Sequence, residues 1–503
     1  MKSLLTVVLA MTTTLTTSCV TATDEDQHAL TIYSRMGAGA VSPDLYRSSA
    51  TSGRNQINVP GYAVVRTVRN MPLQSGVSEV KFSDVAAGID PTTVSFSSLT
   101  DTAGTRVLEQ NYQFDLVSAQ KLLERYIGQK IIVEQVRGEQ VDRVEGELLG
   151  TVGGLTMGLD DGRVIAVQNY ANVYYPELPG GLITQPTLVW MIDAERGGDH
   201  DIAVGYQTEG MTWWADYNAV LHDGDECTLD LNAWVSIVNQ SGASFPEARL
   251  KLVAGDVNRA PTAQPRRQVY QKEMVAMAVA DEGFAESELF EYHLYTLGRR
   301  TSVPDRSTKQ LELFPAANGL KCERTLLYEG SRHAGYGNRP QVNQGYLANT
   351  NSPVQAFVSF ENKESHGLGI PLPKGRVRVS QLNPSDGALE FIGEDLIDHT
   401  PRNETVSLKL GDAFDVVGER TQVNFKVDER TRVMEETYRI EIRNQKRGNA
   451  TVTIKEAMYR WNNWQISKSN HDYETLDAAT IQFILDIPAE ETGVVEYTVR
   501  YTW

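Results

Sequence analysis

The 503-residue chain has few cysteines and few basic residues for its length. It contains three cysteines, and its 47 Lys and Arg residues are outnumbered by 65 Asp and Glu, which gives a formal net charge of -18 at pH 7. A surface that binds phosphates needs a basic excess, so this balance argues against nucleic acid as a partner. Beyond residue 22 no window approaches the ~20 consecutive apolar residues of a transmembrane helix, so none is predicted.

Common enzyme motifs are also missing. The sequence contains no HExxH, GxSxG, CxxC or Walker A pattern, which removes the usual zinc-protease, hydrolase, redox and nucleotide signatures. We therefore predict no cofactor and no metal ion, and we assign no catalytic residue. Because a site assembled from separated residues leaves no local motif, two functions stay open. The first is a non-enzymatic structural or binding protein, and the alternative is a hydrolase or carbohydrate-binding protein of the envelope.

The N-terminus has the pattern of a secretory signal peptide over residues 1–22. Lys2 precedes an apolar stretch from Leu4 to Met11, and small polar residues follow. Val20-Thr21-Ala22 suits cleavage by signal peptidase, whereas the segment from Leu15 to Cys19 resembles a bacterial lipobox in which Thr16 occupies the position that usually holds Leu. We expect an exported protein, either periplasmic with Cys19 removed or anchored to the outer membrane by a lipid on Cys19.

The other two cysteines are Cys227 and Cys322. An oxidising compartment favours a disulfide between them. Two separate buried thiols are the other interpretation, because Cys is among the most buried residue types.

Short apolar runs bounded by Gly, Pro, Ser and Asp predict a mainly β fold with β-sandwich domains. Residues 23–60 show little periodicity and are interpreted as a partly ordered lead segment. We expect a β-rich N-terminal domain over 61–115, a small helix-plus-barrel unit over 116–175, and a β-sandwich region with two subdomains over 176–503. No internal repeat is evident.

The unit over 116–175 begins with a predicted helix at 116–127, where apolar residues follow helical spacing until Gly128. Short strands are predicted at 129–136, 144–149, 154–159 and 164–167. A helix leading into short strands resembles the Sm-like (SH3-like) barrel, which would imply RNA binding. The segment Leu155-Thr156-Met157 lacks the base-binding Asn of Sm proteins, and the unit has six basic against eight acidic residues. We therefore predict the shape without the activity.

Three groups of residues are candidate sites. The aromatic group Tyr206, Trp213, Trp214 and Tyr217 and the pair Trp461 and Trp464 could bind sugars or fill a core, and core packing is the preferred interpretation. The acidic loops at 196–201 and 222–226 are interpreted as turns. On a strand, the adjacent residues Asp398 and His399 point to opposite faces, and Asp395 and His399 are about 13 Å apart, so we expect no shared metal ion. We expect these residues to fix a strand-to-loop junction by hydrogen bonds.

Two segments carry a family resemblance, GEDLIDHTPRNE from Gly393 and LGDAFDVVGER from Leu410. They resemble the bacterial family of domain of unknown function 4139, with its exported proteins similar to mucoidy inhibitor A. Further matching segments are PGYAVVR from Pro60 and YQTEGMTWWADYNAVL from Tyr206, so the resemblance covers nearly the whole mature chain. It implies an exported, β-rich envelope protein. As partner of such a protein we expect another envelope protein or a polysaccharide. It implies no reaction.

Overall fold

The computed structural model describes residues 27–34, 59–137, 140–177, 179, 182–222, 224, 226–255, 257–258, 284–331, 339–348, 352–383 and 385–503. The predicted signal peptide, with Cys19, and most of the predicted lead segment lie outside these residues. Strands dominate the described ranges, which confirms the prediction of a mainly β fold with several sheets. No helix in these ranges is both long and apolar enough to cross a membrane.

Two compact units are interleaved in the sequence. Unit 1 is formed mainly by residues 66–85 and 91–206, and unit 2 mainly by residues 29–65, 86–90 and 207–503. Four strands of the described ranges have residues in both units: β1 (Gln27–Ser34), β2 (Gly61–Leu73), β4 (Ile89–Ser98) and β12 (Gly198–Glu209). The compact units are not contiguous in the sequence, because strands pair with partners far away along the chain. The predicted domain boundaries stay a prediction.

Unit 1 contains a three-stranded sheet in which the middle strand is antiparallel to both neighbours. Its order is β3 (Gly76–Ser83), β11 (Thr187–Ala194), β5 (Thr105–Gln113). Trp190 of β11 is fully buried and contacts the rings of Phe82 and Phe96. These large rings account for much of the apolar area that holds the sheet together.

Unit 1 also contains the predicted helix and the short strands after it. Helix α1 (Ala119–Arg125) begins at Ser118, whose side chain accepts a hydrogen bond from the Lys121 amide, and Gly128 follows it with a positive φ of 82°. The strands form their own five-stranded sheet in the order β10 (Tyr170–Tyr174), β6 (Lys130–Arg137), β7 (Gln140–Gly150), β8 (Leu155–Gly158), β9 (Val164–Val167). The likeness to an Sm-like barrel stays a prediction.

Residues 27–34, within the predicted lead segment, form a strand that the sequence analysis did not assign. Strand β1 (Gln27–Ser34) pairs in parallel with β15 (Phe245–Ala254), and its Leu30 and Ile32, which belong to unit 2, are fully buried. Strand β15 also pairs with β17 (Tyr292–Leu297) and β18 (Thr301–Val303), and β17 pairs with β16 (Phe284–Leu289). A strand this short could not be predicted from its own residues, because its pairing partner β15 is distant in the sequence.

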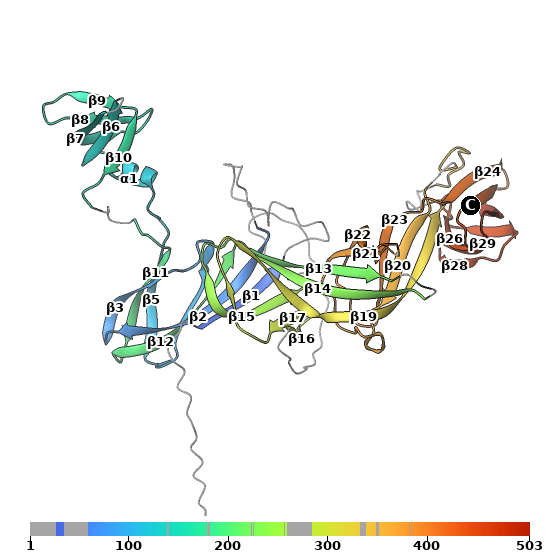
Figure 1. Ribbon diagram of the computed structural model, residues 1–503, viewed down its shortest axis with the longest axis horizontal. Helices are drawn as coiled ribbons and strands as arrows, with labels where there is room; N and C mark the ends of the chain where they lie inside the picture. The colour runs from blue at the N-terminus through green and yellow to red at the C-terminus, as the bar shows by residue number, and fades with distance from the viewer. Residues whose placement is uncertain are drawn as a thin grey trace, which may run out of the picture. The chain divides into compact units, whose positions relative to one another are not determined.

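A ten-stranded sheet forms the framework of unit 2 (Figure 1). Its strands are β13 (Met211–Leu221), β14 (Thr228–Asn239), β19 (Ser307–Glu329), β20 (Gln355–Glu361), β21 (Gly375–Leu382), β22 (Leu389–Ile397), β23 (Thr405–Asp412), β26 (Ala450–Ala457), β28 (Glu474–Asp477) and β29 (Thr480–Ile487). The long strand β19 pairs first with β14 and then with β20 and β26. A short 3-10 helix, η2 (Glu364–His366), follows β20.

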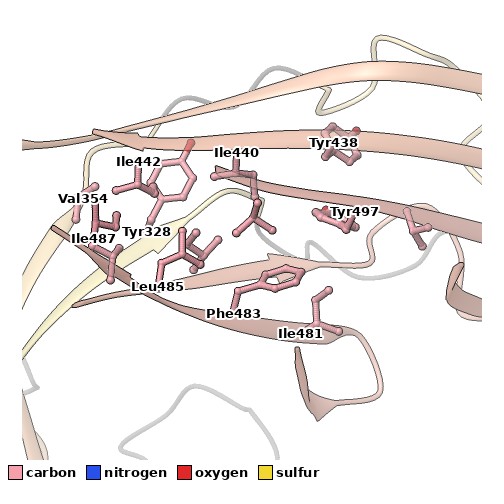
Figure 2. Close-up of a cluster of buried hydrophobic side chains, with 14 of the residues drawn as sticks. Tyr328, Val354, Tyr438, Ile440, Ile442, Ile481, Phe483, Leu485, Ile487 and Tyr497 are labelled. Atoms are coloured by element: carbon pink, nitrogen blue, oxygen red, sulfur yellow. The ribbon is translucent and has the colours of Figure 1, made fainter. Parts of the chain in front are cut away.

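A four-stranded sheet packs on part of this framework as a β-sandwich. Its order is β24 (Val416–Asp428), β25 (Val433–Asn444), β30 (Thr492–Thr502), β27 (Trp464–Ser469). Figure 2 shows Ile440 and Ile442 of β25 facing Phe483 and Leu485 of β29 across the core. The inward residues of β30 alternate with outward ones, as the sequence predicts for a terminal strand.

One arrangement of four strands occurs three times in unit 2, although no repeat was evident in the sequence. In each module the first strand pairs antiparallel with the fourth, and the second with the third. The modules are β14, β15, β18 and β19; β20, β21, β22 and β23; and β25, β26, β29 and β30. The division of residues 176–503 into two subdomains stays a prediction.

Each module is closed by an asparagine, which we call the Asn latch. The three asparagines, all fully buried at the end of the first strand, are Asn239, Asn362 and Asn444. Each side-chain amide donates hydrogen bonds to a carbonyl in the following loop and to the carbonyl of a proline after the third strand: Ala243 and Pro304, Ile370 and Pro401, Gly448 and Pro488. Each side-chain oxygen accepts a backbone amide, from Ser241, Gly369 and Lys446. The latch thus joins the two connections of a module.

Candidate functional site

Cys227 and Cys322 form a disulfide in the structure. Their sulfur atoms are 1.98 Å apart, their Cα atoms are 5.0 Å apart, and they are separated by 95 residues in the sequence. The amide of Cys322 also donates a hydrogen bond to the carbonyl of Cys227 at 3.0 Å. The bridge therefore joins the start of β14 to the middle of β19 in the first module.

The arrangement in unit 1 that most resembles a nucleophile and its base is a serine–histidine pair. Ser98 Oγ lies 2.9 Å from His200 Nδ1, but Ser98 is only 1% exposed and His200 only 2%. Asp101 accepts hydrogen bonds from Arg196 and the Gly104 amide, and the hydrogen bond from Arg196 lowers the pKa of Asp101. A nucleophile must reach its substrate, so this group is built to hold a turn rather than to attack a carbonyl.

Asp395 and His399 make hydrogen bonds to backbone around the end of β22. The Asp395 carboxylate accepts the amides of Leu396 at 2.8 Å and Lys409 at 2.7 Å. His399 Nδ1 accepts the amide of Lys374 at 3.2 Å. These contacts fix a junction between strands, which is the role that we expected; that the segment binds no metal stays a prediction.

The first aromatic group considered as a sugar site, within residues 206–217, is buried, whereas Trp461 and Trp464 are partly buried. Trp213 is 2% exposed and donates to the Ile32 carbonyl, while the fully buried Tyr217 donates to the Pro373 carbonyl. Tyr206 and Trp214 are also buried. These rings therefore pack the interior. In the acidic loop, His222 pairs with Asp230 at 2.9 Å, and residues 223 and 225 lie outside the described residues.

A group of buried charges and tyrosines lies inside the sandwich of unit 2, and sequence reasoning missed it. Its members, which we call the charge cluster, are Arg420, Glu436, Tyr438, Glu456, Tyr459, Arg460 and Tyr497. They come from β24, β25, β26, β30 and the residues directly after β26. The side chains of both arginines and both glutamates are fully buried, so each charge depends on its partners.

The first ion pair joins β24 to β26. Arg420 Nε lies 3.0 Å from each Glu456 carboxylate oxygen, and its guanidinium carbon lies 3.5 Å from the centre of the Tyr438 ring. Tyr497 donates a further hydrogen bond to Glu456. Next to this pair, a Cβ atom at Gly330 would lie 1.7 Å from a Glu456 oxygen, so only glycine fits there without movement.

The second ion pair joins β25 to the end of β26. Arg460 Nε lies 2.6 Å from Glu436 Oε1, and the same oxygen accepts hydrogen bonds from Gln422 and Tyr438, both at 2.8 Å. Tyr438 and Tyr459 are linked by their hydroxyl groups at 2.6 Å. The two ion pairs are thus connected through Tyr438.

The outer ends of both arginines hold one loop, residues 339–348. Arg420 Nη1 donates to the carbonyls of Leu347 and Ala348, and Arg460 donates to those of Gln341, Asn343, Gln344 and Tyr346, at 2.6 to 3.4 Å. The loop in turn donates the Gln341 amide to the Arg460 carbonyl at 3.0 Å. Six carbonyls of one loop are therefore fixed by two arginines.

Burial and neighbouring charge shift the pKa values of the cluster. Burial raises the pKa of Glu436, and the charge of Arg460 opposes this shift. Burial alone would lower the pKa of Arg420, but Glu456 and the surrounding tyrosines raise it well above its ordinary value. Burial raises the pKa of Tyr497 well above its usual range. Because these groups are bonded to one another and to the loop, the cluster acts as a clamp.

Strand alternation could have revealed the cluster. Glu436 occupies the same face of β25 as Tyr438 and Ile440, and Glu456 the same face of β26 as Val452 and Ile454. A glutamate at an inward position of an otherwise apolar face predicts a buried partner. The identity of that partner does not follow from the pattern, because it comes from another strand.

The charge cluster, the disulfide and the three Asn latches all lie in one part of the chain that matches a known family. The model of the family described as Domain of unknown function (DUF4139) matches residues 202–503, which is more than half of the chain. No curated protein matches. The likeness to mucoidy inhibitor A stays a prediction. The chain belongs to the DUF4139 family, as the sequence predicts.

Proposed function

We infer that this chain is an exported protein of the bacterial cell envelope with a structural or binding role and no enzymatic activity. The observation that carries the inference is the disulfide between Cys227 and Cys322. Structural disulfides persist in oxidising compartments such as the periplasm and are rare in the cytosol. The pattern of residues 1–22 supports the same location.

The bonding of the charged groups supports a non-enzymatic role. A catalytic carboxylate or base needs a free side reached by the substrate. In the charge cluster, Glu456 is bonded to Arg420 and Tyr497, and Glu436 to Arg460, Gln422 and Tyr438. These carboxylates are fully buried and held by each other's neighbours, so no substrate reaches them, which suits a rigid scaffold that presents loops to a partner.

The test is the fate of the full chain expressed with its own N-terminus in a Gram-negative bacterium. We expect it in the periplasmic or outer-membrane fraction, cleaved after Ala22 or lipid-modified at Cys19, with no free thiol at Cys227 or Cys322 after denaturation without reductant. A Cys19→Ser variant separates the two forms, because only an anchored protein moves from the membrane to the soluble fraction.

The matched control is a variant with Leu5→Arg and Leu9→Arg, which interrupts the apolar stretch. It should remain in the cytosol with both thiols free. A wild-type chain that stays in the cytosol with residues 1–22 intact and two free thiols would overturn the proposal.

A further inference from the structure

The loop over 339–348 is held with its backbone inward and its side chains outward. Its carbonyls bind Arg420 and Arg460, whereas residues 342–346 are exposed. Buried ion pairs are a poor way to gain stability, because apolar residues of the same size often stabilise a core as well. What the two ion pairs supply in this molecule is a single fixed conformation of the loop. Fixing a loop before binding lowers the entropy lost in the complex.

The loop lies beside a second segment, residues 459–464. The Gln341 amide bonds to the Arg460 carbonyl, and the Tyr346 and Tyr459 rings are 6.0 Å apart. Trp461 and Trp464 are partly buried, while Asn462 and Asn463 between them are exposed. We call the exposed part of residues 339–348 and 459–464 the loop surface.

The loop surface has no acidic residue in an acidic protein. Neither segment contains Asp or Glu, although the whole chain carries a formal charge of -18, and Arg339 at the start of the loop is its one exposed charged side chain among the described residues. The charge of Arg460 is matched by Glu436 inside the cluster. The exposed groups are mainly the amides of Asn343, Gln344 and Asn462, which can both donate and accept hydrogen bonds.

We propose that the loop surface binds an uncharged polysaccharide, and this proposal rests on the binding role inferred above. Amide side chains match the many hydroxyl groups of a sugar chain, and aromatic rings such as Tyr346 offer an apolar face to its C–H groups. A protein partner fits less well. Protein interfaces centre on large buried anchors, whereas the most exposed large apolar side chains here are Val342 at 37% and Tyr346 at 38%.

The test uses the purified full chain and isothermal titration calorimetry. The probes are uncharged hexasaccharides of β-1,4-glucose, α-1,4-glucose and β-1,4-N-acetylglucosamine, together with the neutral polysaccharide fraction of the envelope of the encoding bacterium. We expect binding to at least one probe. Tyr346→Ala should weaken it about tenfold, the effect of losing one aromatic contact, and Asn462→Ala should weaken it less.

Two further variants show whether the surface and its clamp are responsible. Tyr473→Ala removes a tyrosine of similar exposure, 41%, elsewhere in unit 2 and should leave binding unchanged. Glu436→Gln keeps the shape of the clamp but removes one charge, so it should weaken binding through a looser loop. Circular dichroism and the unfolding midpoint verify that each variant is folded.

Three results would overturn the proposal: no binding to any of these probes by folded protein, equal binding by wild type and Tyr346→Ala, or binding only to charged glycans or to a polypeptide. The export test does not depend on this surface. A correctly exported and bridged protein that binds no uncharged glycan would therefore refute this inference alone.

Discussion

The first and third modules share a backbone arrangement and an Asn latch, yet they are reinforced in different ways. In the first module, the covalent bridge between Cys227 and Cys322 joins β14 to β19. In the third module, Glu436 ties β25 to Arg460 in the segment after β26, and Glu456 ties β26 to Arg420 of β24. The same fold is thus stabilised once by a constraint on the unfolded chain and once by buried polar contacts. Only the ion pairs of the third module also position a loop, residues 339–348.

Removal of the disulfide should have the largest effect. The bridge closes a loop with a sequence separation of 95 residues. In the chain-entropy model such a loop contributes about 4–5 kcal/mol, less any strain. We expect the variant with Cys227→Ser and Cys322→Ser to lose that amount of unfolding free energy, measured by urea titration of tryptophan fluorescence. Cys19→Ser is the control that leaves the bridge intact, and a double variant as stable as this control would contradict the prediction.

Removal of one arginine from the charge cluster should have a comparable but smaller effect. Arg420→Met leaves the Glu456 carboxylate buried without its partner, which costs about 3–5 kcal/mol. Replacing both residues, with Arg420→Met and Glu456→Leu, should recover most of that loss, because no charge is left buried. Urea titration of the two variants measures the difference. Equal stability of the single and double variants would show that packing, rather than the unpaired charge, sets the loss.

Removal of a latch should have a smaller effect that is similar in all three modules. Replacing Asn239, Asn362 or Asn444 with alanine leaves carbonyl groups without their buried donor, which costs about 1–3 kcal/mol for each site. Asn449→Ala, at an exposed position of the third module, is the control and should change stability by less than about 0.5 kcal/mol. A loss confined to one module would mean that the latches are not equivalent.

Local features of the fold could be predicted from the sequence, and distant pairings could not. Strand β9 matches the predicted strand at 164–167, and α1 lies within the predicted helix, because apolar spacing and Gly128 are local signals. Strand β1 was missed since its eight residues are recognisable only beside β15. The interleaved units were not predicted for the same reason, because no local pattern specifies which strands pair.

The repeat and the charge cluster were missed for different reasons. The latches leave a weak local trace, Asn-Gln at 239–240 and again at 444–445, but Asn362 is followed by Lys363, so the trace does not extend to the second module. In the charge cluster, Glu436 and Glu456 share a strand face with apolar residues, which is a local sign of burial. Their partners Arg420 and Arg460 could not be identified, because that pairing follows from the packing of one sheet on the other, which a single strand does not specify.

Two buried tyrosines differ in whether their hydroxyl group has a hydrogen-bond partner, and this difference should have the smallest effect on stability. The Tyr217 hydroxyl, beside the first module, donates to the Pro373 carbonyl at 2.7 Å, whereas the Tyr328 hydroxyl, beside the third module, has no hydrogen-bond partner among the described residues. Burial raises the pKa of Tyr328 from 10.0 to about 12, with the Glu456 charge adding to the shift and the Arg420 charge opposing it. At neutral pH, we expect Tyr328→Phe to change stability little.

The stabilities of the wild type and of Tyr328→Phe should differ at alkaline pH. The folded state holds the Tyr328 proton more tightly than the unfolded chain, so the contribution of this tyrosine to stability is complete below pH 10.0 and is lost as the pH rises toward about 12. Relative to Tyr328→Phe, the wild type should therefore become less stable across that interval. Urea midpoints of both proteins at a series of pH values measure the gap, and the other buried tyrosines cancel because both proteins contain them. A gap that stays constant with pH would contradict the prediction and would mean that the Tyr328 hydroxyl is better solvated than its burial indicates.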